Sequence, residues 1–101
     1  LMVGKWHLGE EAGAMPQAHG FDRSFALAAS GADNWEKKAY IPYYKDAPWY
    51  EDGVEADLPD DFYSSRFIVD KMIAYLRETD PSKPFFAYLP FQAVHIPVQA
   101  P

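Results

Sequence analysis

The chain opens with the stretch Met2-Val3-Gly4-Lys5-Trp6-His7-Leu8-Gly9, in which a short apolar run leads to a lysine and a histidine two positions apart. In an extended strand, residues i and i+2 share a face and lie about 7 Å apart, so Lys5 and His7 point the same way and Trp6 points into the opposite layer. A fixed cation beside a titratable imidazole can bind an anion and move a proton near it. The alternative is a strand end at which both polar side chains are merely solvated.

The composition is typical of a globular protein and excludes several kinds of function. The 101 residues are 49% apolar and 17% aromatic, which is enough to form a core. The net charge is −6 and no stretch concentrates Lys or Arg, which argues against nucleic acid as the main partner. The absence of cysteine excludes disulfides, thiolate metal sites and thiol catalysis within the chain. No apolar run approaches the roughly 20 residues that span a bilayer, so no membrane partner is expected.

Both ends of the chain look internal to a longer protein. The first residue is Leu1 rather than Met, and Pro101 directly follows an apolar segment. We therefore expect residues 1–101 to be an internal segment with an incomplete fold.

Two strands are predicted in the first third of the chain. Residues 1–8 form a short buried strand that leads into a Gly- and Pro-containing loop. Residues 21–28 alternate well enough for a second strand, with Phe21, Phe25 and Leu27 on one face.

The middle of the chain is predicted to be irregular. Residues 31–59 hold three prolines among many aromatic residues, which forbids long regular elements and indicates a packed excursion. Its rings either line a substrate pocket or pack against the rest of a parent domain. Asp52-Gly53 is typical of a hairpin turn, here between short strands at 47–51 and 54–57.

The clearest predicted element is a helix over residues 61–78. Asp60 or Asp61 is expected to cap its first turn, and capping explains this acidic pair better than a catalytic role. Asp80-Pro81 ends the helix. Phe67 falls on the polar side, which indicates a second contact there. The residues expected on the apolar face are Phe62, Ile68, Val69, Met72, Ile73 and Leu76.

An unbroken apolar run at 84–89 follows the helix and predicts a strand that is covered on both faces, as in a parallel sheet between helix layers. Ligands of open α/β sheets bind beyond the carboxyl ends of the strands. His95 follows this strand as His7 follows the first one. Two histidines and Lys5 are thus expected at one edge of a sheet, which favours the anion site over solvated side chains.

These segments together resemble the type I sulfatases, the formylglycine-dependent hydrolases of sulfate esters, and are closest to bacterial arylsulfatases. The resemblance covers nearly the whole chain and is weakest over 31–58. The segments that carry it, in the order found in the family, are Gly4-Lys5-Trp6-His7-Leu8-Gly9, Gly20-Phe21-Asp22-Arg23-Ser24-Phe25, Asp61-Phe62-Tyr63-Ser64-Ser65, Pro84-Phe85-Phe86-Ala87-Tyr88-Leu89 and His95-Ile96-Pro97-Val98-Gln99.

The resemblance implies an α/β fold in which residues 1–101 are an internal segment of a sulfatase catalytic domain. That domain is an alkaline-phosphatase-like sandwich with a mainly parallel sheet. The family uses a formylglycine, made from a cysteine or serine, beside Ca²⁺ or sometimes Mg²⁺. The motifs that supply the formylglycine and the metal ligands are missing here, so no metal ligand is assigned to this segment. By itself it is expected to be inactive.

The resemblance also implies roles for three residues toward a small sulfate ester. Lys5 would bind the sulfate oxygens and offset the charge that develops on them. His7 would take up the proton that accompanies sulfate release. His95 would hydrogen-bond the bridging oxygen and, with Lys5, help the alcohol or phenol depart.

The chain departs from the family pattern at several positions. Asp33-Asn34 spells the same dipeptide as a metal-binding pair of the family, but it precedes the His95 segment instead of following it, so the metal role is not assigned to it. Val94 and Ile96 stand where a proline and an aromatic residue are common. Two alternatives stay open: a phosphonate or phosphate monoester hydrolase of the same superfamily, and a non-catalytic truncated homologue that binds sulfated ligands.

Overall fold

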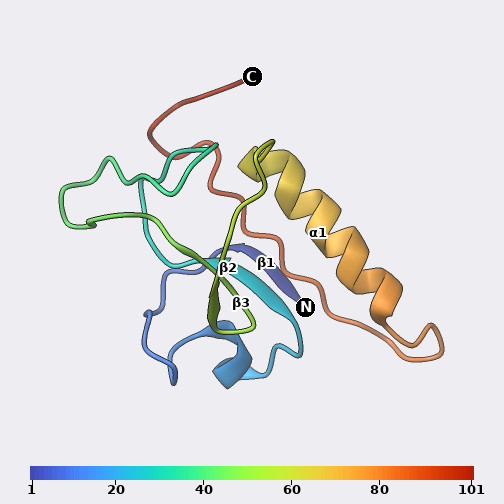
Figure 1. Ribbon diagram of the computed structural model, residues 1–101. Coiled ribbons are helices and arrows are strands. Elements are labelled where there is room, and N and C mark those ends of the chain that lie inside the picture. The colour runs from blue at the N-terminus through green and yellow to red at the C-terminus, as the bar shows by residue number, and fades with distance from the viewer.

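A computed structural model describes all residues from 1 to 101. Four strands form one sheet in the order β1-β2-β3-β4, with one helix beside it (Figure 1). The elements are β1 (Met2–Lys5), the 3₁₀ helix η1 (Pro16–His19), β2 (Ser24–Leu27), β3 (Trp49–Glu51), β4 (Val54–Ala56) and α1 (Ser64–Glu78).

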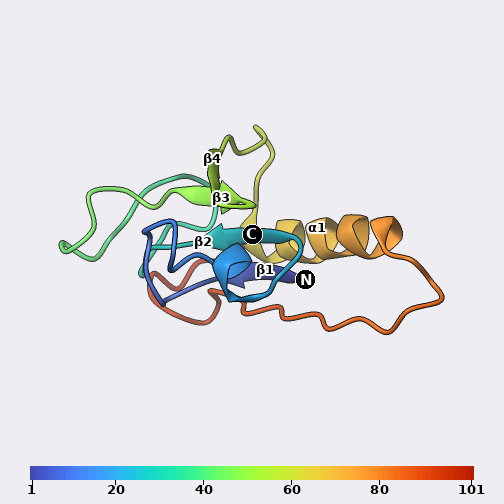
Figure 2. The same ribbon diagram turned by 90° about the horizontal axis from the view of Figure 1, so that it is seen from below.

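The sheet is mixed. β1 and β2 are parallel and in register from Met2 opposite Ser24 to Lys5 opposite Leu27, whereas β2–β3 and β3–β4 are antiparallel. Figure 2 shows the hairpin of β3 and β4 on one side of β2 and the returning C-terminal segment on the far side of β1. The α/β class is therefore confirmed, with parallel pairing around β1 and antiparallel pairing in the hairpin.

The predicted strand at 84–89 is wrong, because the run is irregular apart from an isolated bridge at Tyr88, but the run does lie beside β1. Tyr88 forms a parallel bridge with Met2, its carbonyl accepts a hydrogen bond from the Val3 N–H at 3.0 Å, and the Pro90 carbonyl accepts one from the Lys5 N–H at 2.7 Å. The expectation that both faces of this run are covered is wrong for this chain, because Phe85 and Phe86 are 62% and 70% exposed. The core of this chain lies over β1, β2 and β3, and these two rings lie outside it.

Two separate clusters cover the two faces of the sheet. On one face, α1 packs its buried residues Ile68, Met72 and Tyr75 into the main core. On the other face, Met2, Trp6 and Ala26 form a smaller cluster, so Trp6 does lie in the layer opposite Val3, as predicted. The remaining members of the main core are Phe25, Leu27, Ala29, Ala32, Ala47, Trp49 and Phe62.

The helix differs from the prediction at its start. It begins at Ser64, its N-cap position is Tyr63, and no side chain caps it, so the predicted cap by Asp60 or Asp61 is wrong. The reason is a tertiary contact, because the carbonyl of Asn34 accepts the Ser64 N–H at 2.8 Å. A backbone group thus replaces the acidic cap.

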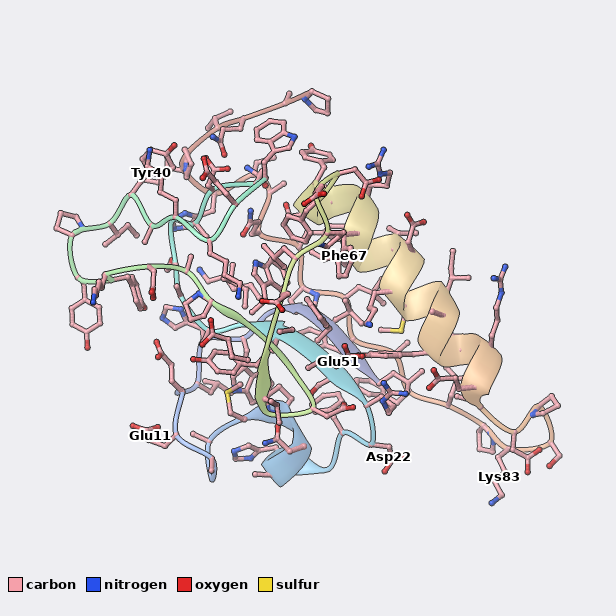
Figure 3. The ribbon with its side chains drawn as sticks, viewed as in Figure 1. Glu11, Asp22, Tyr40, Glu51, Phe67 and Lys83 are labelled. Atoms are coloured by element: carbon pink, nitrogen blue, oxygen red, sulfur yellow. The ribbon has the colours of Figure 1, made fainter.

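The buried face of the helix is also rotated from the predicted one. Val69 and Ile73 are 39% and 41% exposed, whereas Tyr75 is buried. Phe67 makes the additional contact that was expected, with its ring 5.0 Å from that of Phe25 (Figure 3). Aromatic packing on β2 therefore sets the rotation of α1.

The remaining differences are local. Phe21 lies ahead of β2 and packs edge-on against Trp6 at 6.1 Å, so its predicted place on the face of Phe25 is wrong. The hairpin turn is confirmed, because Asp52 and Gly53 have φ of 49° and 87°, as a type I′ turn requires.

The excursion over 31–59 divides its rings between core and surface. Trp49 is fully buried, whereas Tyr43 is 86% exposed.

Candidate active site

Lys5 is the last residue of β1, and its side chain is half-buried at the carboxyl edge of the parallel pair. Because β1 and β2 are parallel and Lys5 is opposite Leu27, the chain that leaves β2 passes next to this side chain. There the Lys5 Nζ donates a hydrogen bond to the Ser30 Oγ at 2.8 Å. The cation is thereby held at one place, with its other donors available to an anion.

His95 reaches the same edge from the segment on the other side of β1. Lys5, Ser30 and His95 line one small pocket, together with Gln92. The structure thus brings Lys5 and His95 together, as the sequence predicted. The other lining residues are Leu27, Gly31, Ala32 and Ile96.

The close approach of these two segments depends on Gly4. Its φ is +139°, and a Cβ atom at this position would overlap the carbonyl of Pro90. Any side chain would therefore push the segment that carries His95 away from the strand that carries Lys5. The glycine of the opening motif thus has a packing role beside the lysine.

The imidazole of His95 contacts a neighbouring backbone carbonyl. Its Nδ1 lies 2.8 Å from the carbonyl oxygen of Ile96, which can only accept, so Nδ1 carries the hydrogen. The ring is exposed, and Nε2 stays free to accept a proton or, when protonated, to donate one.

His7 lies at the same edge but outside the small pocket. The predicted strand over residues 1–8 is too long, because β1 ends at Lys5. His7 therefore lies two residues beyond the strand, and its side chain is exposed. The lining residues of the pocket do not include it.

A cluster of polar side chains, all buried except the half-buried Gln99, adjoins the pocket and was not predicted from the sequence. We call Asp33, Asn34, Ser64, Gln92 and Gln99 the amide cluster. The Asn34 Oδ1 accepts hydrogen bonds from the Ser64 Oγ at 2.6 Å and the Gln92 Nε2 at 2.7 Å. The available signal was the placement of two glutamines on either side of His95 in an apolar context.

Asp33 uses both carboxylate oxygens within the protein. Its Oδ1 accepts the backbone N–H groups of Trp35 and Glu36, and its Oδ2 accepts the Tyr40 hydroxyl at 3.0 Å and the Gln99 Nε2 at 2.8 Å. Burial opposes ionisation, but these donors outweigh it, with Gln99 first, and lower the pKa of Asp33 below its ordinary value. Both carboxylate oxygens of Asp33 are thus occupied by protein donors.

Other candidate features lie away from this pocket. His19 is exposed, and its ring lies 5.8 Å from that of Trp6. A larger groove between residues 19–23 and the end of α1 contains neither Lys5, His7 nor His95. No group of three or more His, Asp or Glu side chains in residues 1–101 is arranged to hold a metal ion. The helix α1 is neither long enough nor apolar enough to cross a membrane.

Comparison with known proteins places this geometry in a family. The sequence model of the Sulfatase family matches residues 1–101. An arylsulfatase of Klebsiella aerogenes is 39% identical over 108 residues, which cover 100% of this chain and 22% of that protein. Arylsulfatase J of Mus musculus is 36% identical over 109 residues, which cover 99% of this chain and 17% of that protein. The chain thus spans about a fifth of the length of these relatives.

Solved structures agree on the fold. The crystal structure of Ps i-CgsB superimposes with a TM-score of 0.80 at 25% identity, over 99% of this chain and 25% of that one. The same protein in complex with k-i-k-neocarrahexaose gives a TM-score of 0.81 at 23% identity. With the family model matching from the first residue to the last, the chain belongs to the sulfatase family.

Proposed function

We propose that this chain is part of a sulfatase catalytic domain and supplies the residues that bind the sulfate group and transfer protons during hydrolysis of a small sulfate ester. The observation that carries the proposal is the common pocket of Lys5 and His95 in a chain that matches the Sulfatase family throughout. A sulfate monoester is a tetrahedral anion, and donors fixed before the reaction stabilise the charge that develops on its oxygens.

Each of the three residues has a distinct task in this proposal. Lys5, held by Ser30, binds the sulfate oxygens. His95 presents Nε2 to the bridging oxygen and assists departure of the alcohol, since its Nδ1 is already bound to the Ile96 carbonyl. His7 takes up the proton that accompanies sulfate release, a task that suits an exposed imidazole.

The nucleophile and the metal belong to other parts of the domain. A formylglycine and a Ca²⁺ (or Mg²⁺) ion, when present, would supply the attacking oxygen and stabilise its charge. The buried carboxylate nearest the pocket, Asp33, is saturated by protein donors, which supports a metal site outside residues 1–101.

The proposal is tested by turnover of the complete protein that contains this chain. Aryl sulfates should be hydrolysed faster than the matching aryl phosphonates. A faster phosphonate reaction would instead assign the protein to the phosphonate or phosphate monoester hydrolases. Binding of sulfated ligands without turnover, in protein that mass spectrometry shows to lack the aldehyde, would support a non-catalytic homologue.

A variant of His7 tests the division of labour. In His7→Ala, one equivalent of phenol should be released in a burst, with no free sulfate, because the step that releases sulfate lacks its proton acceptor. His19→Ala is the matched control, since His19 is equally exposed and lies on the other face of the sheet. Release of sulfate at the unaltered rate by His7→Ala would contradict the role of His7.

A further inference from the structure

The loop that carries His95 is held on both sides by one dipeptide. Gln92 precedes His95 by three residues, and its Nε2 donates to the Asn34 Oδ1 at 2.7 Å and to the Asp33 carbonyl at 3.2 Å. Gln99 follows His95 by four residues, and its Nε2 donates to the Asp33 Oδ2 at 2.8 Å. Both glutamine side chains therefore form hydrogen bonds with Asp33-Asn34.

The second contact of Gln99 fixes its direction. Its Oε1 accepts the backbone N–H of Asn34 at 2.9 Å and the Asn34 Nδ2 at 3.0 Å, so both ends of the amide are used. A rotation of this side chain by half a turn would place donor against donor and acceptor against acceptor. The contact accordingly permits one orientation of the Gln99 amide.

Burial makes the loss of these hydrogen bonds costly in free energy. Asp33 and Asn34 are each 4% exposed, and Gln92 is 7% exposed. A polar group buried to this degree loses its bonds to water, so a displaced loop would leave several donors and acceptors unpaired at once. The arrangement is therefore held in one geometry.

The same dipeptide is tied to the lysine side of the pocket and to the helix. It follows Ser30, the partner of Lys5, by three residues. Through its Oδ1 and its carbonyl, Asn34 also binds the side chain and backbone of Ser64 at the start of α1. Asp33-Asn34 thus joins three segments that are far apart in sequence.

We propose that Asp33-Asn34 is a positioning element that holds the His95 loop in place relative to Lys5 by binding Gln92 before the histidine and Gln99 after it. Neither residue touches the substrate in this scheme. The placement of the loop stands on these contacts, while its effect on catalysis rests on the function proposed above.

Exchanging the donor and the acceptor side chain of one hydrogen bond, that between Gln99 and Asp33, tests this placement in the complete protein. Gln99→Glu sets a carboxylate against that of Asp33, and like charges at this distance repel. Adding Asp33→Asn returns a donor to the pair, with its amide donating to the new carboxylate. Ala18→Glu is the control for the added charge, because Ala18 is exposed and lies in η1, outside the pocket and the amide cluster.

Catalysis should respond in a way that depends on the ester. If His95 assists the leaving group, a displacement of about 1 Å lowers turnover of esters of poorly acidic alcohols by about 100-fold. Nitrophenyl sulfate, whose leaving group needs little help, should change much less. The paired variant should regain most of the loss, and Ala18→Glu should show none.

Hydrogen–deuterium exchange of the segment 92–99 supplies a second measurement that needs no activity. Exchange there should rise in Gln99→Glu and return toward the unaltered rate in the paired variant. Unchanged exchange in Gln99→Glu, or an equal fall in turnover for all esters without recovery in the pair, would overturn the positioning role. If the unaltered protein hydrolyses no sulfate ester, the proposed function fails, and the exchange experiment still decides the role of Asp33-Asn34.

Discussion

The two ends of strand β2 carry two different polar clusters. At its start, Arg23 forms ion pairs with Glu51, Asp52 and Glu78, and Lys71 pairs with Glu51 at 2.8 Å. We call these five residues the ionic cluster. Glu51, labelled in Figure 3, is the last residue of β3 and pairs with Lys71 of α1. Beyond the end of β2 lies the amide cluster, which is neutral apart from Asp33 and more deeply buried.

The difference indicates what each cluster does. Side chains of the ionic cluster are about one-fifth to one-half exposed, so water and salt screen their attraction, and each ion pair tolerates changes in geometry. Buried amides bind only in defined directions and leave costly unpaired groups when displaced. The amide cluster is thus suited to fix the pocket, and the ionic cluster to fasten α1 to the hairpin.

The largest effect is expected at the pocket itself. Lys5→Ala should lower turnover of an aryl sulfate by about 10²–10³-fold, or about 2.7–4 kcal/mol, because a fixed donor to the developing charge is lost. Lys37→Ala is the control, since Lys37 is also half-buried but pairs with Glu55 at 3.2 Å. Equal losses in both variants would show that net charge, and not a placed donor, drives binding.

A smaller effect is expected where the amide cluster meets the helix. The Ser64 side chain is fully buried, and its Oγ donates to the Asn34 Oδ1 at 2.6 Å. Ser64→Ala should lower the free energy of unfolding by about 1–3 kcal/mol, measured by urea denaturation. Ser65→Ala, one position further along α1 and less buried, should change it little. If Ser64→Ala lowers the free energy of unfolding by less than Ser65→Ala does, the amide cluster repacks freely.

A smaller effect is expected from acid, which should reduce the contribution of each cluster to the stability of the protein. Burial raises the pKa of Glu51, but hydrogen bonds from Lys71 and Tyr75 and the nearby charges of Lys71 and Arg23 outweigh burial and lower this pKa. The pKa of Asp33 is lowered in the same way by the donors described above. A lowered folded pKa stabilises the protein above the ordinary values of 4.5 and 3.8, and this contribution is lost as the pH falls through the folded values.

Unfolding measured from neutral pH to pH 3 in Glu51→Gln and Asp33→Asn tests this. Each variant should lose stability less steeply in acid than the unaltered protein. In 1 M salt, where the screening length is about 3 Å, the contribution of Glu51 should shrink and that of Asp33 should persist. Equal salt sensitivity of the two would contradict the contrast between the clusters.

The same contrast separates what the sequence could predict from what it could not. Four of the five predicted strands, the hairpin turn and the placement of Lys5 and His95 follow from local patterns and from the rule for parallel sheet edges, whereas the run at 84–89 forms only an isolated bridge. The start of α1 could not be predicted in this way, because the Asn34 carbonyl, 30 residues away in sequence, replaces the local cap. A search for local capping residues cannot detect such a distant partner. Gln92 and Gln99 were missed for the same reason: their partners are distant in sequence and have no fixed spacing.

The smallest effect is expected in the ionic cluster. Arg23 is 33% exposed in its side chain, bonds three carboxylates and lies over the ring of Tyr75 at 4.4 Å. Arg23→Ala should lower the free energy of unfolding by only about 1 kcal/mol at low salt, and most of this loss should vanish in 1 M salt. Arg66→Ala, at a more exposed arginine, should show almost none. A loss in Arg23→Ala that exceeds that of Ser64→Ala and does not depend on salt would mean that the ionic cluster fixes geometry as firmly as the amide cluster does.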